Sequence, residues 1–212
     1  ERAPSESTQS ESPGAPTPAR ARIVALFDAI SEGVGRAVPW LLLALAGLVG
    51  CTGIPDGVQP VQGFDAERYL GRWYEIARLD HSFERGLTQV TAEYTPGPDD
   101  SVRVLNRGYS EEDGWQSAEG KARFAGPASE GHLEVSFFGP FYGSYIIFEL
   151  DPDYQYAFVS GYSKSYLWLL ARTPTISPAL RERFIRRAAE LGFPVEQLIF
   201  VDQDASAQAK AK

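Results

Sequence analysis

Hydrophobic and polar positions alternate along most of the chain after residue 70, and this alternation predicts a series of short β-strands. In the first strand, Trp73 shares one face with Glu75 and Ala77, while Tyr74 and Ile76 share the other. Both faces carry apolar bulk, so we expect this strand to be covered on both sides. Further alternating segments, separated by turns or loops, span residues 87–95, 102–109, 116–124, 132–138, 142–150, 154–162 and 166–172. Short strands at near-regular spacing imply an up-and-down barrel or a sandwich.

The segment 116–124 bears on the space that such a sheet would enclose. Ala118, Gly120, Ala122 and Phe124 share one face, and charged residues occupy most of the other. The charged face must contact water, so the inner face consists mostly of small residues that leave room inside. An eight-stranded barrel can also be filled completely by side chains. The pattern therefore favours an open cavity, with a plugged barrel as the alternative.

Helical periodicity appears once after the strands. Ser177 is suited to the N-cap, Pro178 to the first helical position and Gly192 to the position after the helix. The helix carries one apolar stripe, made of Leu180, Phe184, Ala188 and Leu191. Such a stripe must pack on an apolar patch outside the sheet, which the outer face of the first strand could partly supply. We expect a short last strand over residues 195–201.

Residues 1–51 have a different character. Residues 1–19 are rich in Ser, Pro, Glu and Thr, and we expect them to be disordered. Arginines at 20, 22 and 36 are followed by an apolar run over 37–50, which is short for a membrane span but typical of the apolar region of a signal peptide. Because the 212 residues contain no Met, we expect the natural N-terminus to differ from the first residue given.

The apolar run ends in Leu48-Val49-Gly50-Cys51, which resembles the bacterial lipoprotein box. In such proteins the cysteine becomes the lipidated N-terminus after cleavage, and Thr52 in the next position favours the outer membrane. Several acyl chains, at about 0.8 kcal/mol per buried CH₂, would hold the protein on the membrane. The alternative is a buried free cysteine at the end of an apolar helix. We thus predict a leader over 1–51, a tether over 52–61, a folded domain over 62–203 and a disordered tail over 204–212.

Composition excludes several classes of function. The net charge of −8 argues against nucleic acid as a partner, because no basic surplus is available to neutralise phosphates. Cys51 is the only cysteine, so residues 52–212 contain neither a disulfide nor a reactive thiol. His81 and His132 have no carboxylate or Cys at metal-ligand spacing; we expect a loop hydrogen-bonding role for His81 and solvation for His132. No nucleophile motif or paired acid motif appears. We predict no cofactor, no metal and no enzymatic activity.

Three short motifs indicate a family. They are Gly71-x-Trp73 at the first strand, Pro152-Asp153-Tyr154 before the seventh, and Arg172 at the end of the eighth. In order and spacing they resemble the motifs of the lipocalins, in which the arginine lies across the tryptophan at the closed end of the barrel. Pro152 replaces the usual Thr, which puts the hydrogen bond of that side chain in question. The resemblance implies an all-β fold, an eight-stranded antiparallel up-and-down barrel with a C-terminal α-helix and a short ninth strand.

Longer stretches narrow the resemblance. Residues 69–78, 80–87, 135–143 and 172–177 are similar to the bacterial outer-membrane lipoprotein lipocalins, which are related to apolipoprotein D and to plant temperature-induced lipocalins. The resemblance implies a barrel that binds fatty acids or lysophospholipids in the bacterial envelope and takes part in lipid handling or stress response. It also implies a lipid anchor in the outer membrane, facing the periplasm.

Barrel alternation then suggests which side chains line the cavity. If Trp73 points inward, Glu75 and Ala77 do so too, with Glu75 serving as a paired structural carboxylate or as a polar anchor. The other candidates are Val90, Ala122, Val135, Phe137, Ile146, Phe148, Tyr156, Phe158 and Trp168, and a polar headgroup would meet Tyr142 and Ser144 near the mouth. The same residues could instead fill a tight barrel.

The sequence thus predicts a non-enzymatic, membrane-anchored lipid-binding protein. A plugged barrel that serves as an interaction module, and an enzyme acting on a bound lipid or pigment, are the alternatives. The aromatic stretch over residues 137–142 could contact a bilayer, contact a second subunit in a homodimer, or simply pack at the rim.

Overall fold

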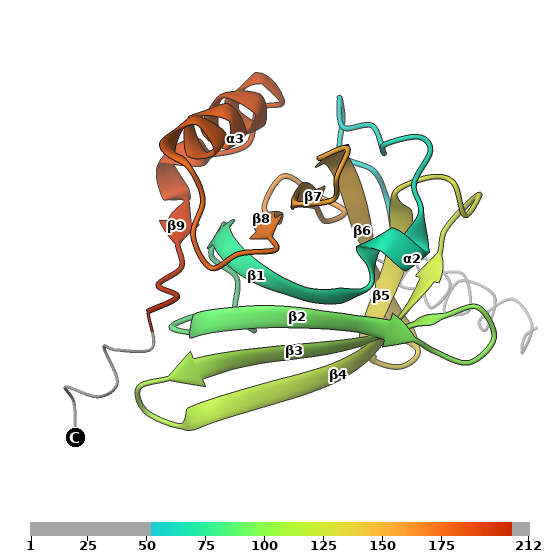
Figure 1. Ribbon diagram of the computed structural model, residues 1–212, viewed down its shortest axis with the longest axis horizontal. Helices are drawn as coiled ribbons and strands as arrows, with labels where there is room; N and C mark the ends of the chain where they lie inside the picture. The colour runs from blue at the N-terminus through green and yellow to red at the C-terminus, as the bar shows by residue number, and fades with distance from the viewer. Residues whose placement is uncertain (1–51, 205–212) are drawn as a thin grey trace, which may run out of the picture. The chain divides into compact units, whose positions relative to one another are not determined.

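The computed structural model describes residues 52–204, which form one nine-stranded sheet with two α-helices and a 3₁₀ turn (Figure 1). Helix α2 (Ala66–Tyr69) precedes the first strand, α3 (Pro178–Glu190) follows the eighth, and the 3₁₀ turn η1 (Val195–Gln197) precedes the ninth. Within these residues no helix is long and apolar enough to cross a membrane. The strands are β1 (Gly71–Arg78), β2 (Thr88–Pro96), β3 (Val102–Ser110), β4 (Gly114–Phe124), β5 (His132–Phe138), β6 (Phe141–Leu150), β7 (Tyr156–Ser160), β8 (Leu167–Ala171) and β9 (Ile199–Phe200).

The first eight strands form a closed antiparallel barrel. Neighbours in the chain pair from β2 through β8, β8 pairs with β1, and β1 closes the barrel by pairing with β2. The short strand β9 adds to β1 through the pairs Ala77–Phe200 and Arg78–Ile199. The predicted eight-stranded up-and-down barrel with a C-terminal helix and a ninth strand is confirmed. Since antiparallel strands alternate in direction, the loops 79–87, 111–113, 139–140 and 161–166 all lie at one end, called the open end below.

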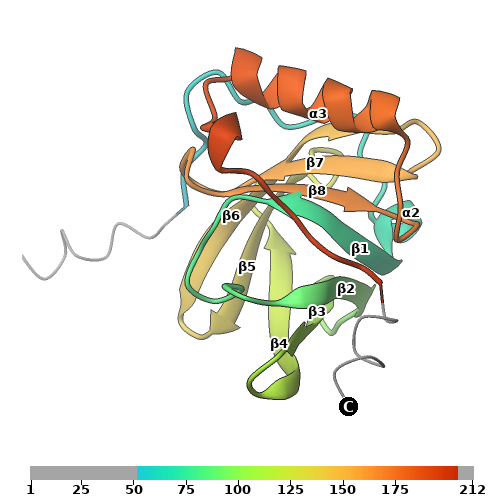
Figure 2. The same cartoon turned by 90° about the vertical axis from the view of Figure 1, so that its left-hand side faces the viewer.

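Two apolar clusters stabilise the barrel, one inside it and one between the sheet and α3. Trp73, Ile147 and Val159 belong to the inner cluster. Phe184 and Ala188 of α3 are fully buried in the outer cluster, together with residues of β1, β6, β7 and β8. Figure 2 shows α3 lying along this side of the barrel. The prediction that the first strand is covered on both faces is therefore confirmed. The strands β6, β7 and β8 are covered on both faces in the same way.

A bulge interrupts the alternation in β1 between Glu75 and Ala77. Trp73 and Glu75 face the interior, whereas Ile76 and Ala77 both belong to the outer cluster. The predicted inward position of Ala77 is therefore wrong, because one extra residue in a strand reverses the faces of the residues after it. After the bulge Arg78 points inward and is buried.

The ends of α3 follow the sequence prediction. The Ser177 hydroxyl accepts a hydrogen bond from the Leu180 N–H at 3.2 Å, Pro178 occupies the first turn, and Gly192 has a φ of +77° after the helix. The predicted strand over residues 195–201 is shorter in the structure. Residues 195–197 form η1 instead, because Pro194 has no N–H for a strand ladder and the chain turns directly after it.

The segment predicted as a tether lies largely against the barrel. Pro55 and Val58 are buried, and Val58 packs in the outer cluster. Val61 donates its N–H to the Ile147 carbonyl and accepts from the Gly131 N–H, both at 2.9 Å. Within the described residues only 52–54 form a continuous exposed stretch before this contact begins. The leader over residues 1–51, including Cys51, and residues 205–212 of the predicted tail lie outside the described residues.

The closed end of the barrel depends on Arg172. Its guanidinium lies 3.9 Å from the ring centroid of Trp73, the contact implied by the family motifs. It also donates to the backbone carbonyls of Arg72 at 2.9 Å, Arg68 at 2.8 Å and Tyr154 at 3.2 Å. One side chain therefore joins α2, β1 and the turn between β6 and β7.

The turn between β6 and β7 carries the second motif. Tyr154 has a φ of +58°, and its hydroxyl accepts a hydrogen bond from the Asp65 N–H at 2.8 Å. The Asp151 carboxylate accepts from the N–H groups of Asp153 at 3.0 Å and Gln155 at 3.2 Å. Asp151 thus binds the backbone of this turn although Pro152, which has no side-chain donor or acceptor, occupies the usual Thr position.

Candidate ligand cavity

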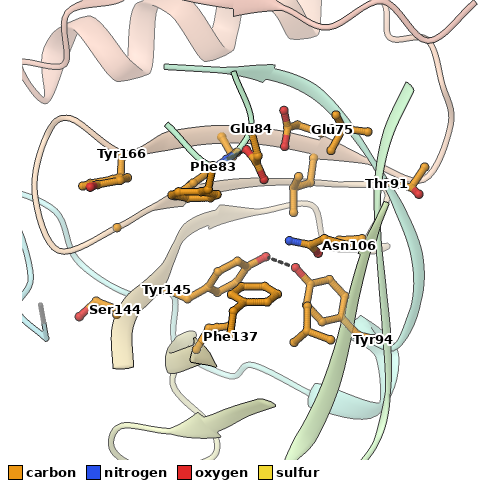
Figure 3. Close-up of a pocket in the computed structure, with 18 of the residues that line it drawn as sticks. Glu75, Phe83, Glu84, Thr91, Tyr94, Asn106, Phe137, Ser144, Tyr145 and Tyr166 are labelled. Carbon is orange, nitrogen blue, oxygen red and sulfur yellow. Dashed lines mark hydrogen bonds between the residues drawn. The ribbon is translucent and has the colours of Figure 1, made fainter. Parts of the chain in front are cut away.

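The barrel encloses a cavity of about 260 Å³ beneath the loops of its open end. Figure 3 shows the side chains that line it. They are apolar or aromatic except for two carboxyl groups, one amide and a few hydroxyls, and no Lys, Arg or His side chain of the described residues is among them. The lining residues are Glu75, Phe83, Glu84, Val90, Thr91, Ala92, Tyr94, Val104, Asn106, Val135, Phe137, Gly143, Ser144, Tyr145, Gly161, Tyr162, Tyr166, Trp168 and Leu170.

Some of the residues expected to line the cavity do lie at it. They are Glu75, Val90, Val135, Phe137, Ser144 and Trp168. Ala122 lines a separate void of about 20 Å³, which shares Tyr94, Val135 and Tyr145 with the main cavity. These positions come from β1, β2, β4, β5, β6 and β8. On most strands of the barrel, the alternation of side chains therefore identified at least one residue that faces the interior.

The other candidates face away from the cavity. Ala77, Ile146, Phe148, Tyr156 and Phe158 pack in or against the outer cluster under α3. Tyr142 lies on the outer side of the sheet, where the Arg123 guanidinium is 3.9 Å from the centroid of the tyrosine ring. For the residues of β6 and β7 under the helix the reason is that α3 buries the outer faces of these strands, so both faces are apolar and alternation cannot distinguish inside from outside. Ala77 faces outward because of the bulge in β1. Tyr145 and Ile147 of β6 are in the inner cluster instead.

The small residues on the inner face of β4 make room mainly for another side chain. A Cβ atom at Gly120 would lie 2.9 Å from two ring carbons of Phe137. The Phe137 ring therefore covers Gly120 and itself lines the cavity. Ala118 lies further along the strand and is exposed. Part of the room inferred from the sequence is thus occupied by Phe137.

A charged cluster is buried in the cavity wall near the open end. Arg78 donates from Nη1 to Glu75 Oε1 and from Nη2 to the backbone carbonyl of Glu84, both at 2.7 Å. The indole N–H of Trp168 donates to Glu84 Oε2 at 3.1 Å. His81 Nε2 also lies 3.1 Å from Glu84 Oε2, although it is not aligned for a hydrogen bond. All four ionisable residues are at most 6% exposed, so their charges interact strongly.

The two carboxyl groups of this cluster differ in proton affinity. Burial, and then the charge of Glu84, raises the pKa of Glu75 well above its usual value despite the contact with Arg78. Burial alone would raise the pKa of Glu84 as well, but His81, Trp168 and Arg78 together lower it. We conclude that Glu84 carries the negative charge and that Glu75 retains its proton to higher pH.

A second polar group lies deeper in the barrel. The hydroxyls of Tyr69 and Tyr145 are 2.7 Å apart, and those of Tyr145 and Tyr94 are 2.9 Å apart (Figure 3 shows the second pair). Burial raises the pKa of all three hydroxyls, so they remain neutral donors and acceptors. Two hydrogen bonds use two of three O–H groups, which leaves one donor. Beside them, Asn106 Oδ1 has no hydrogen-bond partner among the described residues.

Several lining residues escaped the sequence prediction. Tyr94 shares a face with Val90 in the alternation of the second strand, so the pattern did contain its position. Tyr145 was missed because the inner face of β6 was assigned to Ser144, Ile146 and Phe148, of which only Ser144 lies at the cavity. Phe83, Glu84 and Tyr166 lie in or beside loops, where no periodicity exists to place a side chain.

Neither histidine forms part of a metal site. Within residues 52–204 no group of three His, Cys, Asp or Glu side chains is placed to hold a metal ion. His132 is half-buried rather than solvated as expected, and burial lowers its pKa. His81 packs against rings, with its ring centroid 4.0 Å from that of Phe83.

Exposed aromatic rings surround the open end. Phe138 and Phe141, at the turn between β5 and β6, are 81% and 74% exposed. Phe83, Trp115 and Tyr162 are exposed in or beside the other loops of this end. The rings Phe138 and Phe141 belong to the stretch for which the sequence left bilayer contact, subunit contact and rim packing open, and their exposure removes rim packing as their role.

Comparison with known proteins places the fold and the motifs in a family. The family model described as a lipocalin-like domain matches residues 64–203. The chain is 57% identical over 166 residues to the outer membrane lipoprotein Blc of Vibrio cholerae, an alignment that covers 77% of this chain and 97% of that protein. It is 50% identical over 153 residues to the protein of the same name from Escherichia coli K12, covering 72% and 86% of the two chains.

More distant relatives and solved structures agree on the fold. Temperature-induced lipocalin-1 of Arabidopsis thaliana is 36% identical over 151 residues, covering 66% of this chain and 80% of that protein. Insecticyanin from the tobacco hornworm Manduca sexta superposes with a TM-score of 0.59 at 20% identity, covering 74% of this chain and 89% of that one. At that identity the superposition shows the fold alone.

Proposed function

The chain belongs to the lipocalin family, and we propose that it is a non-enzymatic protein that carries single-chain lipids, fatty acids or lysophospholipids, in the bacterial envelope. One observation carries the proposal. The barrel contains an apolar cavity that reaches from the loops of the open end toward the tyrosine hydroxyls near the closed end. A plugged barrel would have no such space.

The lining suits an acyl chain. Val104, Val135 and Leu170 offer apolar walls without charge, and each CH₂ moved out of water contributes about 0.8 kcal/mol. The volume of about 260 Å³ is just below the usual range of roughly 300–1,000 Å³ for small-molecule sites. The cavity therefore favours one slender chain over the two chains of a membrane phospholipid.

The proposed place of action is the outer membrane. The curated relatives at 50–57% identity are named outer membrane lipoproteins. We propose that this chain is likewise anchored through a lipidated Cys51, with its barrel facing the periplasm and a role in lipid handling or stress response. A Cys51→Ala chain that still fractionates with membranes as a lipidated species would overturn the anchor. A homodimer through the exposed rings of the open end remains part of the proposal.

The carrier function is tested by titration of the purified, delipidated chain with palmitate and with palmitoyl lysophospholipids. We expect saturable one-to-one binding, followed by tryptophan fluorescence and checked by native mass spectrometry. Ala92 lines the cavity, so Ala92→Phe adds a ring to it and should weaken binding at least tenfold. Ala179→Phe, on the exposed side of α3, is the matched control and should bind like the wild type.

Three results would contradict the proposal. A folded wild-type chain that binds none of these lipids by either readout would favour the interaction module. Equal binding by wild type and Ala92→Phe would mean that the lipid binds elsewhere than in the cavity. Conversion of a bound lipid to product would restore the enzyme alternative.

A further inference from the structure

A groove of about 630 Å³ runs along the outside of the barrel, over β1, β2, β3 and the start of β4. From its side chains we propose that it binds an anionic saccharide, that is, a sugar that carries a carboxylate or a phosphate. Its volume lies within the usual range of roughly 300–1,000 Å³ for small-molecule sites. The inference goes beyond the carrier function and does not depend on it.

The groove lies on the outer face of the sheet, where no helix of the described residues packs. Figure 1 shows α3 and the strands β2, β3 and β4 on opposite sides of β1. The strand register places four lining residues side by side across the sheet, namely Tyr74, Thr91, Arg107 and Ser117. Since Tyr74 packs against the outer cluster, this row faces away from the lipid cavity.

The charge of the groove is opposite to that of the lipid cavity. The described residues that line it include two arginines, Arg72 and Arg107, and no carboxylate. Arg107 is exposed and makes no ion pair or side-chain hydrogen bond with any residue of 52–204. Arg72 makes only a loose pair with Glu93, at 3.7 Å, in which the two side chains are 57% and 42% exposed. Both guanidinium groups are therefore available to an anion.

An exposed indole ring forms one end of the groove. Trp115 is 59% exposed, so burial in the core does not explain a large aromatic residue there. The ring packs edge-to-face with Tyr109, with the two centroids 5.7 Å apart, and this contact limits its motion. The face of an indole ring is electron-rich and attracts the polarised C–H groups on the flat side of a sugar ring. A saccharide stacked on Trp115 would cover the exposed ring.

Hydrogen-bonding side chains lie between Trp115 and the arginines. They are the amides of Gln89, Gln116 and Gln203 and the hydroxyls of Thr91 and Ser117. Amides and hydroxyls both donate and accept hydrogen bonds, as the hydroxyl groups of a sugar require. The groove thus combines a ring for the flat face of a sugar with polar groups for its edge.

The backbone holds two of these amides in place. A bulge in β2 gives Gln89 a φ of +52°, a conformation that is costly for a residue with a Cβ, and its N–H binds the carbonyl of Asp202 at 2.7 Å. Gln203 Nε2 donates to the backbone carbonyls of Glu75 and Val90, at 2.7 and 3.0 Å. The chain after β9 is thereby fixed across β1, as Figure 2 shows, and forms one wall of the groove.

Other classes of ligand use only part of this groove. An extended peptide cannot add to β2 or β3, because both strands are paired on both sides. An acyl chain would leave Arg72 and Arg107 without counter-charges, and a small inorganic anion would leave Trp115 uncovered. A sugar with a carboxylate or phosphate uses all of these groups. The proposed envelope location supplies two sources of such sugars, the cell-wall glycan with carboxylates and lipopolysaccharide with phosphates.

The test titrates the full chain with three sugars that share one ring. They are N-acetylglucosamine, which is neutral, N-acetylmuramic acid, which carries a carboxylate, and N-acetylglucosamine 6-phosphate. The protein is labelled with ¹⁵N and saturated with palmitate, and binding is followed by NMR through the indole N–H signal of Trp115. We expect both anionic sugars to shift this signal and to bind at least fivefold more tightly than the neutral one. The tighter of the two identifies the source, and either order supports the site.

Variants locate the binding. Arg107→Gln should remove most of the preference for the anionic sugars and leave the neutral sugar unaffected. Arg103→Gln, which removes an exposed arginine of the same strand outside the groove, is the matched control and should behave like the wild type. Trp115→Ala, monitored through the amide signals of Gln89 and Gln203, should weaken all three sugars about tenfold. Its control is Phe138→Ala, which removes an exposed ring elsewhere.

The outcomes separate this inference from the carrier function. Equal binding of neutral and anionic sugars, or a preference that survives in Arg107→Gln, overturns the anionic site. No shift with any sugar, or inorganic phosphate binding as tightly as the sugar phosphate, overturns the saccharide. Loss of sugar binding in Trp115→Ala with palmitate binding retained supports the groove. A wild-type chain that binds these sugars but no lipid contradicts the carrier alone.

Discussion

Replacing Arg172 by Met would remove the group that closes the barrel. Met keeps most of the apolar stem, so the change deletes the guanidinium and little packing. The lost contacts are three hydrogen bonds to backbone carbonyls and the stacking on Trp73 at 3.9 Å. The carbonyls belong to Arg68, Arg72 and Tyr154, on segments that lie far apart in the chain.

The expected cost follows from these contacts. Each hydrogen bond is partly exposed to water and contributes about 0.7 kcal/mol, toward the low end of the range of about 0.5–1.5 kcal/mol for ordinary hydrogen bonds and below the range for fully buried charged ones. The cation–π contact adds about 1 kcal/mol. The sum is about 3 kcal/mol of unfolding free energy. Arg172→Lys should recover less than half of it, because one ammonium cannot reach three carbonyls in a fork and stacks less well on the indole.

The assay is equilibrium urea unfolding followed by tryptophan fluorescence. With a slope of roughly 2 kcal/mol/M, a loss of 3 kcal/mol lowers the midpoint by about 1.5 M. Arg183→Met is the matched control, because Arg183 makes a single ion pair with Glu149 at the surface and should cost at most about 1 kcal/mol. If Arg172→Met lowers the urea midpoint no further than Arg183→Met does, the contacts of Arg172 stabilise the fold no more than a surface ion pair, and the reasoning is refuted.

Two further variants test the cavity wall. The raised pKa of Glu75 means that the folded state holds this proton more tightly than the unfolded state, so the group stabilises the fold at low pH and its contribution is lost as pH rises from about 4.5 through the folded pKa. Glu75→Gln should therefore become more stable relative to the wild type as pH rises. Parallel profiles of unfolding free energy against pH for the two proteins would refute the raised pKa. Gly120→Ala places a Cβ 2.9 Å from the Phe137 ring and from the Ser136 carbonyl oxygen, and should cost about 1–3 kcal/mol in urea unfolding and reduce the space for lipid. In the control, Gly126→Ala, the added Cβ contacts only the Glu130 carboxylate, at 3.3 Å, and the variant should have nearly the stability of the wild type. Equal effects of the two substitutions would show that the Phe137 ring moves aside at little cost.

How far the sequence predicted the structure depends on what each residue contacts. The strands, the helix with its Ser177 cap and the contact of Arg172 with Trp73 follow from local patterns or from family motifs, and all are present. The inner and outer faces of β6 and β7 could not be told apart, because α3 makes both faces apolar. The bulge after Glu75 could not be seen either, since it inserts a residue without any composition cue.

The most informative part of the cavity, the loop over residues 79–87, was the part that the sequence could least predict. Its side chains enter the cavity because Arg78, turned inward by the bulge, binds the carbonyls of Glu84 and Leu87. The wrong face predicted for β1 after Glu75 and the failure to predict Glu84 at the cavity therefore share one cause, the bulge in β1.

The same cluster argues for a functional rather than a stabilising role. Burying an ion pair generally gains little stability over an apolar replacement, because the desolvation of both charges offsets their attraction. Here the structure buries one guanidinium with two carboxyl groups, one of which retains its proton at a cost. An apolar lining would close this end of the barrel more simply. What the cluster achieves, and an apolar lining could not, is to hold a loop across the open end, with an ionised carboxylate and the exposed ring of Phe83 both lining the cavity.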